Sequence, residues 1–152
     1  MDTVVAGRAG GRVAVIEREV DIRRPPEAVF DYVSDPLREP EWNPRLRRVT
    51  RLGDALHGVG ARYELEFLPG DPMVVECLRY DRPVGWATAG ASRRLAAGFA
   101  GWVRPTPEGA RLALRMELRP RGLLALALPL LRRHMERDLP RHLTAIKARL
   151  EG

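Results

Sequence analysis

The hydrophobic pattern of this chain changes its period once, near Pro120, and that change is the strongest constraint on the fold. Before Pro120, apolar and charged residues alternate, most clearly in residues 61–68 (ARYELEFL) and 110–119 (ARLALRMELR). Alternation is typical of strands with one buried face, and spacings of three and four are typical of an amphipathic helix. We therefore expect an α+β fold that ends in one long helix. The residues with helical spacing are Leu124, Leu128, Leu131, Met135, Leu139, Leu143, Ile146 and Leu150.

Prolines shape the helical parts of the chain. Pro129 and Pro140 fall inside the C-terminal pattern, so we expect a kink or a break at each. Residues 29–44 (VFDYVSDPLREPEWNP) form a shorter amphipathic stretch with prolines at a spacing of four. Proline removes a backbone donor and restricts the residue before it. This stretch therefore predicts two short helices in place of one.

Seven segments carry the strand pattern, one before the two short helices and six after them. They are residues 13–22, 46–52, 61–68, 73–80, 84–89, 97–104 and 110–119. For residues 73–80 and 84–89 the inward face stays open, because a β-bulge would exchange the two sides of a strand.

Charge and composition exclude several classes of function. The chain has 26 basic and 20 acidic residues in 152, and Lys147 is the only lysine. Its short arginine clusters lack interleaved aromatic residues that could stack on bases, so we expect no nucleic-acid binding. A single cysteine, Cys77, excludes an internal disulfide framework. The longest apolar run, residues 123–131 (LLALALPLL), is far shorter than the roughly 20 residues that span a bilayer.

The N-terminal residues, MDTVVAGRAGGR, lack the apolar segment and cleavage site of a signal peptide. We interpret residues 1–12 as a flexible leader and residues 13–152 as a single domain. A cytoplasmic location follows by default.

The order of these elements and several local motifs resemble the START-like (SRPBCC) superfamily, specifically its polyketide cyclase/dehydrase-type branch. The motifs are IRRPPEAVF at residues 22–30, SDP at 34–36, EWNP at 41–44 and LTAIKARLE at 143–151. The resemblance implies a helix-grip fold, in which a curved antiparallel sheet of about seven strands wraps around the C-terminal helix. It also implies a cavity between sheet and helix, and a bacterial protein that binds a hydrophobic small molecule there.

The resemblance and the strand alternation together suggest which residues line such a cavity. The alternative is that these residues pack on one another as an ordinary core. The candidate ligand-binding residues are Tyr32, Tyr63, Leu65, Phe67, Cys77, Trp86, Phe99, Leu112, Leu114, Met116, Leu128, Leu131 and Met135.

No catalytic constellation, cofactor motif or metal site can be assigned from the sequence. His134 and His142 are eight residues apart, too far to share one ion by themselves, and His134 is expected at the edge of the helix. Three functions stay open. The first is binding of a lipid, polyketide or isoprenoid-like ligand, and the second is a cyclase or dehydratase reaction in the same cavity. The third is an interaction protein that contacts a partner or a membrane surface through residues 123–131. We expect a monomer or a homodimer.

Overall fold

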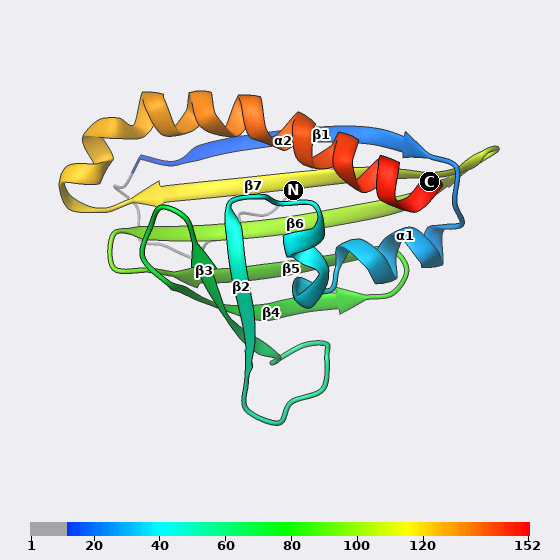
Figure 1. Ribbon diagram of the computed structural model, residues 1–152, viewed down its shortest axis with the longest axis horizontal. Helices are drawn as coiled ribbons and strands as arrows, with labels where there is room; N and C mark the ends of the chain where they lie inside the picture. The colour runs from blue at the N-terminus through cyan, green and yellow to red at the C-terminus, as the bar shows by residue number, and fades with distance from the viewer. Residues whose placement is uncertain (1–11) are drawn as a thin grey trace.

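The computed structural model describes residues 12–152, and within them seven antiparallel strands form one sheet in the order β1-β7-β6-β5-β4-β3-β2 (Figure 1). The strands are β1 (Ala14–Ile22), β2 (Leu46–Leu52), β3 (Arg62–Phe67), β4 (Met73–Asp81), β5 (Gly85–Ala91), β6 (Leu95–Thr106) and β7 (Gly109–Pro120). The helices are α1 (Pro26–Val33), the 3-10 helices η1 (Pro36–Glu41) and η2 (Gly122–Ala127), and α2 (Leu128–Glu151). The expected order of elements is confirmed. The expected leader lies outside the described residues, except for Arg12.

The long helix α2 runs along one face of the sheet, over β1 (Figure 1). The C-terminal half of α2 buries Leu139, Leu143 and Ile146 against Leu112 and Leu114 of β7. Two polar contacts fix the helix end to the end of β1. Lys147 Nζ donates to the Asp21 carbonyl at 2.6 Å, and Arg24 Nη1 donates to the Leu150 carbonyl at 2.9 Å.

The prolines of the α2 region act differently from one another. Pro129 lies in the first turn of α2, where a missing N–H costs nothing, and the chain before it is the separate helix η2. Pro140 lies inside α2, and the helix continues through it to Glu151. The predicted interruption is therefore present at Pro129, while no break occurs at Pro140.

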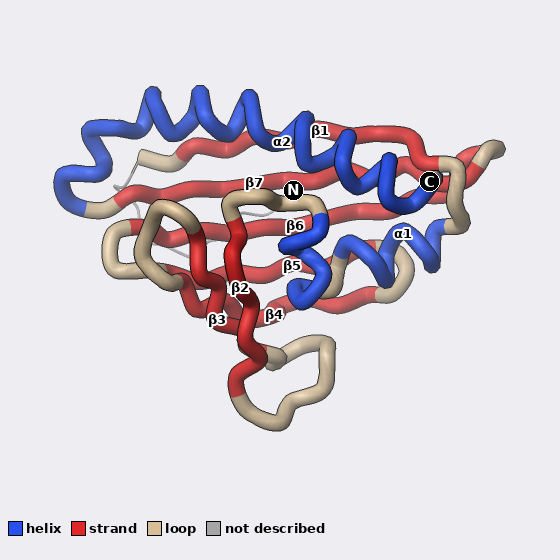
Figure 2. The backbone as a smooth tube through the Cα atoms, in the orientation of Figure 1, coloured by secondary structure: helices blue, strands red, loops and turns tan. Residues whose placement is uncertain are grey.

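The two short helices α1 and η1 close one end of the sheet (Figure 2). The Ser34 N–H donates to the Phe30 carbonyl at 2.9 Å and ends α1. The side chain of Asp35 then accepts the Leu37 N–H at 3.0 Å and starts η1. Phe30 is fully buried, and its ring meets Tyr80 and Trp86 edge-on at 5.2 and 5.4 Å.

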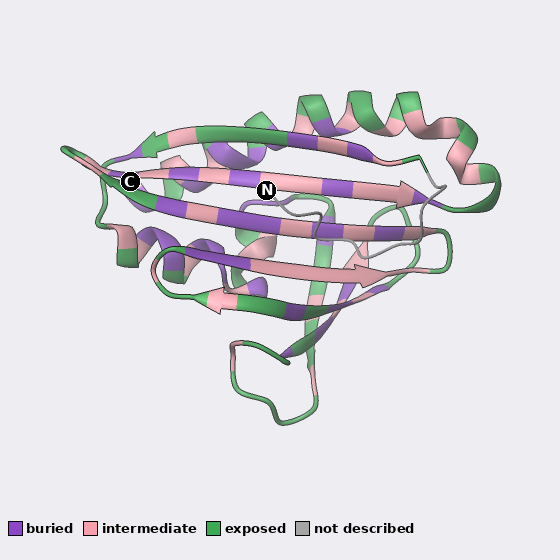
Figure 3. Ribbon diagram, turned by 180° about the vertical axis from the view of Figure 1, so that it is seen from behind, coloured by how far each residue is buried: buried purple, intermediate pink, exposed green. Residues whose placement is uncertain are grey.

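Two buried clusters hold the inner side of the sheet, and they are separate. The first combines α1, α2 and the strands β1, β6 and β7. The second lies on β2, β3 and β4, with Leu46, Tyr63, Leu65, Met73 and Val75 among its members. Along most of their length, β6 and β7 alternate between buried and intermediate residues, as the view from behind in Figure 3 shows. The space between the two inner clusters is where the candidate site lies.

Candidate functional site

A cavity of about 620 Å³ lies between the inner face of the sheet and the N-terminal half of α2. Its walls include members of both buried clusters, such as Met73 and Val75 from β4 and Met135 and Leu139 from α2. Aliphatic and aromatic side chains make up most of these walls. The cavity therefore exists because the clusters do not meet.

Seven of the thirteen residues that the sequence suggested lie on the cavity wall. Strand pairing explains the central pair, since Phe99 on β6 lies opposite Met116 on β7. Whether these side chains touch a ligand stays a prediction. The seven residues are Leu65, Phe67, Trp86, Phe99, Met116, Leu131 and Met135.

Leu112 and Leu114 do not line the cavity, although they share the inward face of β7 with Met116. Both have no exposed surface, because they belong to the first cluster, which joins them to side chains of α1 and of the C-terminal half of α2. Leu128, in the first turn of α2, is half-buried against the first cluster and also lies outside the cavity wall. Leu112 and Leu114 are therefore part of an ordinary packed core, which was the alternative to cavity lining.

Tyr32, Tyr63 and Cys77 also lie away from the cavity wall. The Tyr63 hydroxyl is 3.0 Å from His57 Nδ1, within the second cluster. Cys77 Sγ donates to the Arg79 carbonyl at 3.3 Å, where a β-bulge shifts the register of β4 against β5. The guanidinium of Arg38 lies 5.8 Å from the centre of the Tyr32 ring.

One section of the wall is polar and was not found from the sequence. Glu39 and Asn43 come from η1 and the residues after it, and both line the cavity. The Asn43 carboxamide is held on both sides, because Oδ1 accepts the Arg45 N–H at 3.2 Å while Nδ2 donates to Glu39 Oε1 at 3.1 Å. Burial raises the pKa of the Glu39 carboxyl to about 7, against the opposing effect of the Asn43 hydrogen bond.

A row of three titratable residues on α2 borders the same section. His134, Asp138 and His142 are four residues apart, so they follow one side of the helix, and all three line the cavity. Asp138 accepts from Arg45 Nε at 2.8 Å, and this ion pair joins α2 to the residue before β2. Burial lowers the pKa of His142, whose ring packs edge-on against Trp42 at 5.6 Å. The sequence signal was present, since Asp138 falls midway between the two histidines.

His134 lies at the helix edge, as the sequence indicated, and also touches the cavity. Its Nδ1 is 3.0 Å from Arg137 Nη2 and 3.5 Å from Arg45 Nη2. Because arginine can only donate, His134 Nδ1 accepts and the ring proton belongs on Nε2. Within residues 12–152 no group of acidic, histidine or cysteine side chains is placed to hold a metal ion. The polar section does contain side chains that can donate and accept hydrogen bonds, namely Glu39, Asn43 and His142.

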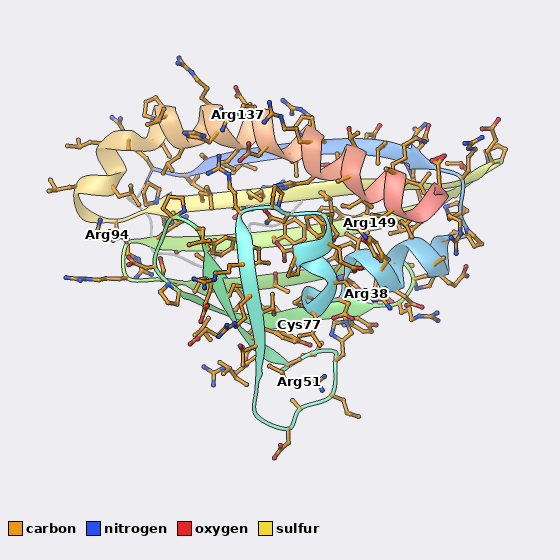
Figure 4. The ribbon with its side chains drawn as sticks, viewed as in Figure 1. Arg38, Arg51, Cys77, Arg94, Arg137 and Arg149 are labelled. Atoms are coloured by element: carbon orange, nitrogen blue, oxygen red, sulfur yellow. The ribbon has the colours of Figure 1, made fainter. Side chains whose placement is uncertain are left out.

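The cavity opens at the end of the molecule where three connections meet. Leu68, Arg94 and Leu130 line the cavity and are also exposed, which marks its mouth. They belong to the β3–β4 loop, the β5–β6 turn and the first turn of α2, which gather at the left of Figure 1. In Figure 4, Arg94 is labelled at this end.

Comparisons with known proteins agree with this architecture. Residues 13–151 match the sequence profile of a family described as "Polyketide cyclase / dehydrase and lipid transport". No curated protein matches the sequence.

Solved structures share the fold at low sequence identity. The ZhuI aromatase/cyclase from a Streptomyces species has a TM-score of 0.74 at 16% identity, over 92% of this chain and 94% of that chain. A START superfamily protein from Mycobacterium smegmatis has a TM-score of 0.72 at 16% identity, over 90% and 97%. The di-domain aromatase/cyclase StfQ of the steffimycin biosynthetic pathway has a TM-score of 0.69 at 16% identity, over 91% of this chain and 51% of that one. At such identities the likeness establishes the fold.

Proposed function

The chain belongs to the polyketide cyclase/dehydrase and lipid transport family, and from this membership and the cavity geometry we propose that it binds a hydrophobic small molecule between the sheet and α2. The observation that carries the proposal is the cavity of about 620 Å³ with largely apolar walls. Ligand sites have volumes of about 300–1,000 Å³ and a few placed polar groups, and this cavity has both features.

An energetic argument supports an occupied cavity. A dry void of 620 Å³ would cost about 15 kcal/mol at about 24 cal/mol per Å³. This figure is an upper bound, because the cavity has a mouth, and it reaches the top of the net stability of a typical domain, about 5–15 kcal/mol. Water fills such an apolar space poorly, because it finds few hydrogen-bond partners there. An apolar ligand is the better occupant.

The polar section narrows the ligand class. Phe99, Met116 and their neighbours would contact an apolar body, while Glu39, Asn43 and His142 would meet one polar end. A protonated carboxyl near neutral pH donates a hydrogen bond, so Glu39 suits a carbonyl or hydroxyl oxygen. We therefore propose a ligand with a flat or flexible hydrocarbon body and an oxygen function at one end, as in a polyketide, an isoprenoid alcohol or a neutral lipid.

A second candidate function is a cyclase or dehydratase reaction in the same cavity. It is favoured by Glu39 and His142, two proton-exchanging groups on the wall of one apolar cavity. Two relatives of the same fold are called aromatase/cyclases. Conversion of a bound polyketide that stops in Glu39→Gln, with binding retained, would support this function over simple binding.

The binding proposal can be tested by filling the cavity. Ala97 lies on the wall next to Phe99 and opposite Leu118. Ala97→Leu should weaken binding of the neutral dye Nile red by at least about tenfold, because a tenfold change needs only about 1.4 kcal/mol of lost contact. Dye fluorescence, titrated in the absence of membranes, measures the affinity.

Ala89→Leu is the matched control. Ala89 lies on β5 one residue after Thr88, which lines the cavity, so its side chain projects to the opposite face of the sheet. This variant should bind the dye as the unchanged protein does. Equal affinity of all three proteins, or no binding by any of them, would contradict the proposal.

A further inference from the structure

Exposed leucines gather around the mouth of the cavity. Leu123 and Leu126 on η2 are 86% and 81% exposed, and Leu130 and Leu68 are 55% and 56% exposed. The burial of α2 side chains begins only at Met135. All six residues of η2 belong to the described part of the chain, and none of them is buried. Here the chain places large apolar side chains in solvent, next to an apolar cavity.

Two of these leucines, Leu123 and Leu126, lie on η2 at one end of the fold. Gly122 has a φ of +57°, a conformation that side chains disfavour, and it turns the chain out of β7 into η2. Figure 1 shows η2 at the left end of the molecule, beside the β3–β4 loop and the β5–β6 turn. The four exposed leucines thus belong to segments at one end of the protein, and two of them, Leu68 and Leu130, line the cavity.

Arginines flank the leucines of η2 and the first turn of α2 along the chain. Residues 119–135 contain four arginines and no acidic residue. Of these, Arg121, Arg132 and Arg133 are exposed and form no ion pair with any residue in the described part of the chain. Arg93 and Arg94 add to the group from the β5–β6 turn, where Arg94 is 3.9 Å from Asp71. The acidic residues nearest to the leucines along these segments are Glu66 and Asp71, on either side of Leu68, and Glu136.

Exposed leucines with arginines beside them match the chemistry of one kind of partner, which is apolar inside and negatively charged at its surface. We propose that the mouth, formed by η2, the first turn of α2 and the β3–β4 loop, docks on the surface of an anionic lipid bilayer. Leu123, Leu126, Leu130 and Leu68 enter the boundary between headgroups and acyl chains, and the arginines contact anionic headgroups.

A lipid surface fits better than a second copy of the chain. A symmetric dimer through this end would bring Arg121, Arg132 and Arg133 close to the same residues of the other copy, where like charges repel. Nucleic acid would satisfy the arginines and leave the leucines in water. In this orientation the cavity mouth faces the bilayer, so a hydrophobic ligand passes between bilayer and cavity without crossing water.

Vesicle sedimentation tests the proposal. The unchanged protein should pellet with vesicles of phosphatidylcholine and phosphatidylglycerol, and much less with phosphatidylcholine alone. High salt should weaken the binding, because it screens the arginines. Leu123→Glu combined with Leu126→Glu should lower the partition coefficient by at least about tenfold. Both side chains are more than 80% exposed, so the fold should tolerate the change, and an unaltered circular dichroism spectrum checks this.

The matched control is a second pair of exposed apolar residues. Leu56 and Val59 are 84% and 67% exposed in the β2–β3 loop, at the bottom of Figure 1 and away from η2. Leu56→Glu combined with Val59→Glu should pellet as the unchanged protein does. The proposal is overturned if the unchanged protein stays in the supernatant with anionic vesicles, or if the two double variants behave alike.

Two further measurements distinguish membrane docking from ligand binding and from dimer formation. Nile red binding without membranes should be the same in Leu123→Glu/Leu126→Glu as in the unchanged protein, so docking and ligand binding can fail independently. A dimer in analytical ultracentrifugation that the same variant dissociates would make a second copy the occupant and overturn membrane docking.

Discussion

Glu39 is the residue whose environment differs most from what its sequence context suggests. In PLREPEWNP it reads as one charged residue in a short, proline-rich helix. In the fold its carboxyl lines the cavity, and Oε1 accepts a hydrogen bond from the Asn43 amide at 3.1 Å. The adjacent Arg38 lies 3.9 Å from Asp35 instead, and Arg45 pairs with Asp138 on α2. Within residues 12–152, Glu39 is thus a carboxyl without an ion-pair partner, and burial raises its pKa.

Replacing Glu39 by glutamine should stabilise the protein in alkaline solution. The folded carboxyl has a pKa of about 7 against an ordinary 4.5. Between these values the unfolded chain releases a proton that the folded chain keeps, so stability falls as pH rises through this window. The full shift corresponds to about 3 kcal/mol, and partial contact with the cavity reduces it, so we expect Glu39→Gln to gain about 1–2 kcal/mol at pH 8.

Urea unfolding at pH 8 and at pH 4 measures this gain. At pH 4 both proteins have a neutral side chain at position 39, so the difference should vanish. Burial lowers the pKa of His142, which gives the opposite slope in both proteins and cancels in the comparison. A gain of the same size at both pH values would contradict the assigned protonation of Glu39.

At the scale of elements, the contact between β5 and β6 sets one wall of the cavity. Trp86 of β5 lies opposite Gly101 of β6, and a Cβ atom at position 101 would overlap the indole ring. Trp86 itself lines the cavity and packs against Phe30 of α1. The absence of a side chain at Gly101 therefore fixes both the position of the indole and the approach of α1.

Gly101→Ala should destabilise the protein by about 1–3 kcal/mol, because the rigid indole must move out of a packed position. Trp86→Phe combined with Gly101→Ala should cost less than the sum of the two single changes, since the smaller ring leaves room for the methyl group. Urea unfolding of the four proteins gives this double-mutant cycle. Additive costs would contradict the close contact.

The elements themselves were predictable from the sequence, and the side chains that face the cavity were predictable only in part. The period change near Pro120 gives the strands and the helix, because each follows from local spacing. The inward face of β4 was not predictable, since the bulge between Cys77 and Arg79 shifts the register. Leu114 and Met116 have the same parity and different surroundings, because Leu114 is packed inside the first cluster while Met116 lies where that cluster borders the cavity.

At the scale of the whole molecule, the cavity follows from two hydrophobic clusters that one curved sheet keeps apart. The first cluster fixes the C-terminal half of α2, and the second fixes the β2–β3 hairpin and β4. The N-terminal half of α2 lies over the space between them. None of the helices in residues 12–152 is long and apolar enough to cross a membrane. The resemblance of short motifs to a family predicted this arrangement. The size of the cavity and its polar section became known only from the structure.

The most direct test of the account is native mass spectrometry of the protein purified from its own kind of host, followed by organic extraction. We predict a discrete extra mass of a few hundred daltons that extraction removes, and a lower occupancy in Ala97→Leu than in Ala89→Leu. A ligand-free mass for all three proteins, with no thermal stabilisation by lipids or aromatic polyketides, would contradict the claim that the cavity binds a hydrophobic small molecule.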